Sequence, residues 1–357
     1  MAVSRYPYRV FISYSHVDRI QVECLAEILA DANLTPMWDR HLAPGVDFPD
    51  QIRSFITNAH VFLPFLTPAS IKRPWLNQEI GYAAAMGKPI LPVAVGVVPL
   101  GIITGVQAIQ FGESLDDAAE KLSAECFARI AEATKVQPAT YECTDDNARR
   151  AQMLADYANG VSALEQYGRI RQRASLTTFH LPKHGPKHAI WKQYFEARPD
   201  DLFLFEALRS ERIALEKHAR SVGCRLILDP IESVEVVYKN HGPASAPERI
   251  RGLLAFLTDR TISDVVVAIN DNPERKSSLT LVGDWFCSEA VSSAISSSGL
   301  NALKEAVFTR HHQTVRTEID DFDLLMKDLL AAMGWDEGSS RSRAISYLEK
   351  YLERTGS

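Results

Sequence analysis

The chain has 357 residues, of which 46% are hydrophobic and 24% charged, and this globular composition excludes intrinsic disorder over most of its length. The length exceeds one ordinary domain and indicates two, or two with a helical connector. The formal net charge of -6 is spread evenly, which argues against nucleic acid or an anionic membrane as the main partner.

The sequence gives no sign of a targeting or membrane segment. Its start, MAVSRYPYRVFISYS, lacks the cationic residues and long apolar run of a signal peptide. The most apolar stretch, residues 89–111, contains prolines and glycines that would interrupt a helix in lipid. The five cysteines are widely spaced without a C-x-x-C pair, so neither a disulfide framework nor a zinc site is expected. We therefore expect a protein of the reducing cytoplasm.

The first third of the sequence alternates strand and helix signals. Short apolar runs predict strands at residues 9–15, 34–38, 60–66, 90–95 and 106–111. Helices are predicted at about residues 22–29, 50–58, 74–86 and 115–133. We expect Asp18 to cap the first helix, Pro74 to open the third and Gly87 to end it. This alternation predicts a parallel sheet covered by helices on both faces.

Ligands of such sheets bind at the carboxyl ends of the strands, beside the point where the strand order reverses. Ser13, Tyr14, Asp39 and the loop Thr67–Arg73 all follow predicted strands, so their position makes them candidate binding residues. The alternative is that Ser13 and Tyr14 only end a strand and that Asp39 only opens a turn.

A connector and a second α/β region are predicted beyond the first third. Residues 136–141 are typical of a linker, and residues 145–175 form a polar stretch that we expect to be helical. Further strands are predicted at residues 224–228, 264–269 and 278–282, and further helices at residues 205–222, 248–257 and 315–330. The polar tail around residues 338–343 is expected to form a mobile turn. The predicted domains are therefore residues 1–137, a connector over 138–199, and residues 200–357.

Two features of this second region have competing interpretations. His180, His184 and His188 have a spacing that would align three imidazoles on a helix for zinc, but the prolines between them forbid a regular helix, so no metal site is expected. Arg212 interrupts the apolar stripe of a predicted helix. We expect it to be ion-paired or to extend along the apolar surface, with a ligand contact as the alternative.

Three pieces of the first domain, taken in order, are similar to Toll/interleukin-1 receptor (TIR) domains, and in particular to bacterial ones. They are Val10–Ser15 with Asp18, Trp38-Asp39 leading into Leu42–Gly45, and Trp75-Leu-Asn-Gln-Glu79. The resemblance covers about residues 6–135. It implies a flavodoxin-like five-stranded parallel sheet, in which the stretch Asp39–Asp47 corresponds to the BB loop used in self-association.

Many bacterial and plant members of this family cleave the nicotinamide–ribose bond of NAD+. The resemblance places their catalytic glutamate, which lies in a W-x-x-x-E pattern, at Glu79, and it implies NAD+ as a substrate with no separate cofactor. A carboxylate near the ribose can stabilise the positive charge that develops as the bond breaks. Trp75 lies four residues earlier on the same helix face, where its ring can stack on a base. The alternative is a Trp that packs in the core and a Glu that is solvated near a helix start.

The expected substrate-binding residues share a place at predicted strand ends or at the start of the third helix: Ser13, Tyr14, Trp38, Asp39, Arg73 and Trp75. Arg73 departs from the family, which often carries serine two residues before the tryptophan. Its positive charge could bind a pyrophosphate or could simply be solvated.

The second domain, over about residues 200–330, loosely resembles one half of phospholipase D-like domains, on the stretches CRLILDP, LTLVGDWFCSEAV and VFTRHHQTV. The chain contains no H-x-K motif, so that superfamily's phosphodiester chemistry is not expected. We interpret this domain as a sensor or assembly module that responds to an unknown trigger. The sequence thus predicts an NAD+-cleaving effector of bacterial antiphage defence that self-associates through its TIR domain, with a non-enzymatic TIR adaptor as the alternative.

Overall fold

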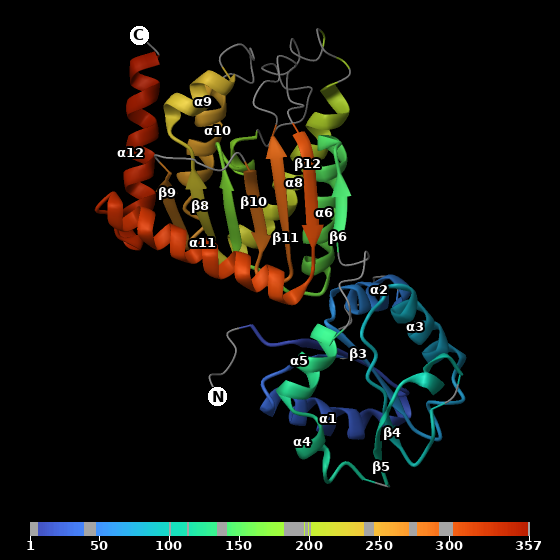
Figure 1. Ribbon diagram of the computed structural model, residues 1–357. Helices are drawn as coiled ribbons and strands as arrows, with labels where there is room; N and C mark the ends of the chain where they lie inside the picture. Colours follow the sequence, from blue (N-terminus) through green and yellow to red (C-terminus); the bar gives the residue numbers. More distant parts are fainter. Residues whose placement is uncertain are drawn as a thin grey trace. The chain divides into compact units, whose positions relative to one another are not determined.

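The computed structural model describes residues 6–38, 48–99, 101–112, 114–133, 141–181, 196, 199, 201–238, 246–270, 277–292 and 303–355. Two compact units make up the chain, one formed mainly by residues 1–140 and the other mainly by residues 141–357 (Figure 1). Each unit has its own sheet and its own covering helices. No helix in the described ranges is long and apolar enough to cross a bilayer.

The first unit alternates strands and helices in the predicted order. Its strands are β1 (Arg9–Ser13), β2 (Thr35–Met37), β3 (Val61–Leu66), β4 (Val93–Val95) and β5 (Ile109–Phe111). Its α-helices are α1 (Arg19–Asp31), α2 (Phe48–Asn58), α3 (Pro74–Ala85), α4 (Ala118–Lys121) and α5 (Ala124–Ala133). Two 3-10 helices, η1 (His16–Asp18) and η3 (Gly101–Gly105), lie in the connections.

The five strands form one parallel sheet in the order β2-β1-β3-β4-β5. The predicted flavodoxin-like fold is therefore confirmed. The chain adds β2 on one side of β1 and all later strands on the other side, so the order reverses between β1 and β3. Ligands of such sheets bind beside this reversal, at the carboxyl ends of the strands.

Strand β1 is buried on both faces of the sheet, which explains its continuous apolar sequence. Val10 and Ile12 belong to the core that the sheet forms with α1, α4 and α5. Phe11 faces the other way and stacks on Phe55 of α2, with ring centroids 5.5 Å apart. The polar residues that follow the strand are thus carried to the edge of a rigid core.

The ends of α3 agree with the predicted signals, whereas the last helix of the unit does not. Pro74 occupies the first turn of α3, and Gly87 takes a φ of +62° directly after its C-cap residue. The prediction of one helix over residues 115–133 is wrong, because the chain breaks between α4 and α5. There Ser123 Oγ accepts a hydrogen bond from the backbone N of Cys126 (3.3 Å) and caps the second helix.

The second unit contains seven strands and six α-helices in the described ranges. The strands are β6 (Tyr141–Thr144), β7 (Ile170–Ala174), β8 (Cys224–Leu228), β9 (Val265–Ile269), β10 (Ser277–Val282), β11 (Phe286–Ser292) and β12 (Leu303–Thr309). The α-helices are α6 (Asn147–Ala163), α8 (Asp201–Val222), α9 (Ile231–Tyr238), α10 (Ala246–Leu257), α11 (His312–Ala332) and α12 (Glu337–Thr355). A 3-10 helix, η5 (Thr178–His180), follows β7.

Its sheet is mixed, in the order β6-β12-β11-β10-β7-β8-β9, with β7, β8 and β9 parallel and the other pairs antiparallel. The stretch that the sequence assigned to a connector, residues 138–199, therefore contributes β6, α6 and β7 to this unit. The expected helix over 145–175 is wrong beyond α6. Strand β7 lacks an apolar sequence pattern because it contains charged residues. One of them, the buried Arg171, pairs with Asp323 of α11 through two hydrogen bonds of 2.7 and 2.9 Å.

Helices cover both faces of this second sheet. Arg171 of β7 contacts α11, which crosses the sheet in Figure 1. The next residue, Gln172, points to the opposite face and bonds to the Thr178 hydroxyl, which in turn bonds to Glu211 of α8. The expected turn at residues 338–343 is also wrong, because Asp336 accepts from the backbone N of Ser339 (2.9 Å) at the start of α12.

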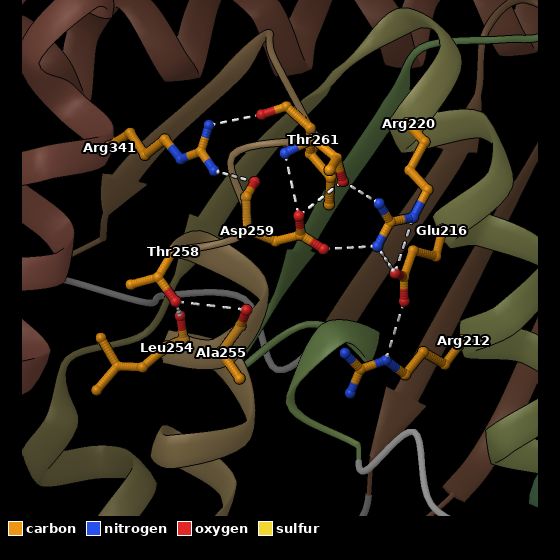
Figure 2. Close-up of polar contacts among 10 residues, drawn as sticks. Arg212, Glu216, Arg220, Leu254, Ala255, Thr258, Asp259, Thr261 and Arg341 are labelled. Carbon is orange, nitrogen blue, oxygen red and sulfur yellow. Dashed lines mark hydrogen bonds and ion pairs between the residues drawn. The ribbon is translucent and has the colours of Figure 1, made fainter.

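A polar network joins α8 to the end of α10 (Figure 2). Arg212 Nε lies 3.4 Å from Glu216 Oε2. Arg220 forms ion pairs with both Glu216 and Asp259, with 2.6 Å between Arg220 Nη2 and Asp259 Oδ2. The expected ion-paired state of Arg212 is therefore confirmed. Burial lowers the pKa of this arginine, and the Glu216 carboxylate offsets part of that effect.

All five cysteines are free in the structure. Cys224 and Cys287 are buried in the second unit, and burial raises the pKa of each thiol to about 12. Both thiols are therefore protonated at neutral pH and unreactive as nucleophiles.

Candidate active site

A cavity of about 180 Å³ opens at the carboxyl end of β1, at the point where the strand order of the first sheet reverses. Three segments distant in sequence form its wall. The lining residues are Phe11, Ile12, Ser13, Tyr14, Ser15 and His16 from β1 and η1, Ile52 from α2, and Ser70, Arg73, Trp75, Leu76 and Glu79 from the β3–α3 connection and α3.

Glu79 is the acidic group of this cavity and is only 6% exposed. It lies on the inner face of α3 with Leu76, Ile80 and Ala83, which explains its burial. Its Oε2 accepts a short hydrogen bond from Ser13 Oγ, at the end of β1. A buried carboxylate is costly unless polar groups contact it, and the Ser13 hydroxyl provides such a contact. The fold thus brings these two predicted residues together.

Trp75 lies one turn before Glu79 on α3, and both side chains line the cavity. The indole is 37% exposed, so it does not serve mainly as core packing. Part of this residue is therefore exposed, and a planar ligand can stack on an aromatic surface of this kind.

Arg73 and Tyr14 complete the predicted part of the lining. Arg73 is exposed at the N-terminal end of α3, where its guanidinium favours the ionised form of the Asp18 carboxyl. Tyr14 is half-buried against the core and contacts the His16 ring edge-on, with centroids 6.0 Å apart. The predicted residues thus supply the cavity with a carboxylate, a guanidinium and the aromatic rings of Tyr14 and Trp75.

Two predicted residues do not belong to this lining. Trp38 is 8% exposed and packs in the core of the first sheet, and it borders a separate surface depression along α1 together with Arg19, Glu23 and Pro36. Asp39 and the loop Asp39–Asp47 lie outside the described residues. The structure therefore groups Ser13, Tyr14, Arg73, Trp75 and Glu79.

The cavity is also lined by Ser15 and His16, which the sequence did not indicate as site residues, and by Ser70 of the predicted loop Thr67–Arg73. Ser15 is 1% exposed, and within the described ranges its hydroxyl has no hydrogen-bond partner. Ser70 is fully buried and His16 is exposed. All three lie in segments that follow a strand end, so position was the available signal. Residue type alone did not distinguish these two serines and one histidine from ordinary polar loop residues.

Asp18 differs from its predicted role. It stands at the N-cap position of α1, but its side chain makes no capping hydrogen bond. Its Oδ2 instead accepts a hydrogen bond from Thr67 Oγ1 (2.8 Å), in the β3–α3 connection. Burial raises the pKa of this carboxyl, and the Thr67 hydrogen bond and Arg73 offset part of the rise.

The described residues contain no group of His, Cys, Asp and Glu that could hold a metal ion. His180 is instead engaged with Thr177 and Arg249, and His184 and His188 lie outside the described ranges.

Residues 10–124 match the family model for the TIR domain, so this part of the chain is similar to TIR domains. Among solved structures, the chain is similar to the Clostridium botulinum CMP N-glycosidase BcmB. The likeness has 20% identity and a TM-score of 0.23, and it covers 32% of this chain and 97% of that chain. None of the curated proteins matches the sequence.

Proposed function

We propose that the TIR domain cleaves the bond between nicotinamide and ribose in NAD+, with Glu79 as its catalytic residue. The observation that carries this proposal is a nearly buried carboxylate in a cavity at the strand-order reversal, held by the Ser13 hydroxyl and one helical turn from Trp75. The TIR match over residues 10–124 supports it at the level of the family.

The chemistry needs few groups. Breaking the glycosidic bond develops positive charge on the ribose, and a carboxylate beside it lowers the energy of that transition state. Nicotinamide leaves as a neutral molecule from a cationic pyridinium, so no strong general acid is required. Glu79 supplies the negative charge, and the Ser13 hydrogen bond fixes the direction in which the carboxylate points.

The size of the cavity limits how the dinucleotide binds. Its volume of about 180 Å³ is below the roughly 300 Å³ at which pockets begin to enclose a drug-sized ligand. The cavity therefore takes the nicotinamide–ribose end, while the remainder of the dinucleotide extends across the rim. Arg73 lies on that rim and would pair with the pyrophosphate, and Trp75 would stack on a base.

The wider role follows by family analogy. The second unit would restrain the TIR domain until a trigger binds, and self-association through the loop Asp39–Asp47 would then complete the site. Loss of NAD+ would halt the metabolism of an infected bacterium, which fits a defence effector of the cytoplasm. Water or an adenine nitrogen attacking the ribose would give ADP-ribose or a cyclic product, respectively.

The test uses purified full-length protein with NAD+, with nicotinamide measured by chromatography over a range of protein concentrations. Wild type should release nicotinamide more rapidly per molecule as concentration rises, and Glu79→Ala should not release it. Gln78→Ala is the matched control, because Gln78 is an exposed neighbour on the same helix. A protein that self-associates in size-exclusion chromatography but never releases nicotinamide would support the adaptor alternative and contradict the proposal.

A further inference from the structure

The two main walls of the cavity come from segments about 50 residues apart, joined by a hydrogen bond that lies outside the cavity. One wall is the end of β1 with η1, and the other is the connection Thr67–Arg73 with the start of α3. Ser13 and Glu79 also join these walls, but inside the cavity, where a substrate would compete for the Glu79 carboxylate. A substrate in the cavity would not compete for the Thr67–Asp18 hydrogen bond of 2.8 Å, because neither residue lines the cavity.

Thr67 organises the whole connection that leads into α3. Its hydroxyl donates to Asp18 and accepts from the backbone N of Ala69 (3.2 Å) and Ser70 (3.1 Å). Its own backbone N donates to Ser70 Oγ (2.8 Å), and Ser70 Oγ donates to the carbonyl of Phe65 (2.9 Å). The backbone N of Arg73 then donates to the Ser70 carbonyl (3.0 Å). The rim residue Arg73 is thus tied to Thr67 through Ser70.

Asp18 anchors this connection on the opposite wall. Its backbone N donates to the Ser15 carbonyl (2.7 Å), so Asp18 is fixed to the segment that lines the cavity. Although Asp18 stands at the N-cap position of α1, its carboxylate makes no capping hydrogen bond and accepts one from the Thr67 hydroxyl instead. It also attracts the Arg73 guanidinium, which lies on the rim.

We propose that Asp18 and Thr67 are positioning residues that hold the rim of the NAD+ cavity, Arg73 and Trp75, against the end of β1. This inference rests on the proposed function. Glu79 lies further along α3, among buried apolar residues that fix it independently. Loss of the Thr67 hydroxyl should therefore weaken substrate binding at the rim and leave the chemical step nearly intact.

The experiment measures kcat and KM for nicotinamide release with full-length Thr67→Val, which keeps the shape of threonine but lacks its hydroxyl. KM should rise about five- to tenfold while kcat stays within about twofold. Thr67→Ser restores the hydroxyl and should restore KM. Thr57→Val is the matched control, because it removes a threonine hydroxyl that contacts Tyr82 of α3 (3.4 Å) outside the cavity.

A fall in kcat with KM unchanged would reveal a merely structural role and overturn the proposal, as would an equal rise of KM in Thr57→Val. If wild type releases no nicotinamide, the proposed function fails, and hydrogen exchange of residues 68–76 decides the positioning role. Exchange that is faster only in Thr67→Val, and slow again in Thr67→Ser, supports it. Exchange that is unchanged in Thr67→Val overturns it.

Discussion

Glu79 occupies a helix position that packing alone would give to an apolar side chain. Its neighbours on the inner face of α3 are Leu76, Ile80 and Ala83, and all are buried. Placing a carboxylate there costs desolvation energy that an alanine or leucine would avoid. A position that is poor for stability and that faces a cavity is what a catalytic carboxylate requires. We expect Glu79→Leu to leave the first unit at least as stable as wild type in chemical unfolding.

Trp75 gives a prediction at the same scale. Because its indole is 37% exposed, Trp75→Ala should change the melting temperature little, yet it should raise KM for NAD+ about tenfold through the lost stacking contact. Trp75→Phe keeps an aromatic face and should recover most of the affinity. Steady-state kinetics with both variants checks this. Equal KM values for Trp75→Ala and wild type would show that the ring does not touch substrate.

Helix α12 shows how one side chain can hold an element in place. Arg341 donates to three backbone carbonyls around the end of α10, those of Leu257 (2.7 Å), Ile262 (2.6 Å) and Asp259 (2.7 Å). Figure 2 shows the guanidinium facing Asp259 and the turn that follows α10. The Asp259 carbonyl also accepts from the backbone N of Ile262 (3.2 Å), and the guanidinium adds a donor to each of the three carbonyls.

Arg341→Lys should therefore destabilise the second unit by about 1–3 kcal/mol, because an ammonium cannot reproduce the planar array of donors. Arg343→Lys, at an exposed position on the same helix, is the control and should be neutral. Chemical unfolding followed by circular dichroism measures both. Equal stability of the two variants would mean that the guanidinium contacts contribute nothing.

Over the whole molecule, the predictable parts are those with one dominant signal. The central strands β1 and β3 carry apolar runs because both of their faces are buried, and the sequence therefore locates them. Strand β7 could not be found in this way, since the partner of its buried Arg171 lies 152 residues away. Trp38 was expected at the site, but its indole turns into the core.

The candidate site was predictable in part for a similar reason. Positions after strand ends and the W-x-x-x-E pattern identified Ser13, Trp75 and Glu79. The contact between Ser13 and Glu79 spans 66 residues and depends on how α3 lies against β1, which no local pattern encodes. Asp18 was expected to cap a helix, and only the fold places Thr67 beside it.

Two histidines with lowered pKa values, the half-buried His180 and the buried His218, make the second unit sensitive to acid. Burial, and next the Arg249 charge, hold the pKa of His180 well below its usual value, and burial lowers that of His218. Below about pH 6.5 the unfolded chain binds protons that the folded unit does not, so stability is full above this pH and falls as the pH drops. Each histidine contributes up to about 1.4 kcal/mol per pH unit.

Calorimetry between pH 7.5 and 5.5 should therefore show a falling melting temperature for the transition that Arg341→Lys also lowers. In His218→Gln, the glutamine side chain can still accept from the backbone N of Gly168 and donate to the Ala158 carbonyl. This variant should reduce the slope of melting temperature against pH. A slope that is unchanged in this variant would contradict the assignment.

The role of Glu79 is tested most directly by the rate of nicotinamide release from NAD+ by full-length Glu79→Gln. Wild type is measured at the same protein concentration, and the melting temperatures of both proteins are compared. The glutamine can still accept the Ser13 hydrogen bond but carries no charge. We predict a loss of at least about 100-fold in kcat, the effect expected when a charge that stabilises the transition state is removed. A Glu79→Gln protein that releases nicotinamide as fast as wild type would show that the charge of Glu79 is not catalytic.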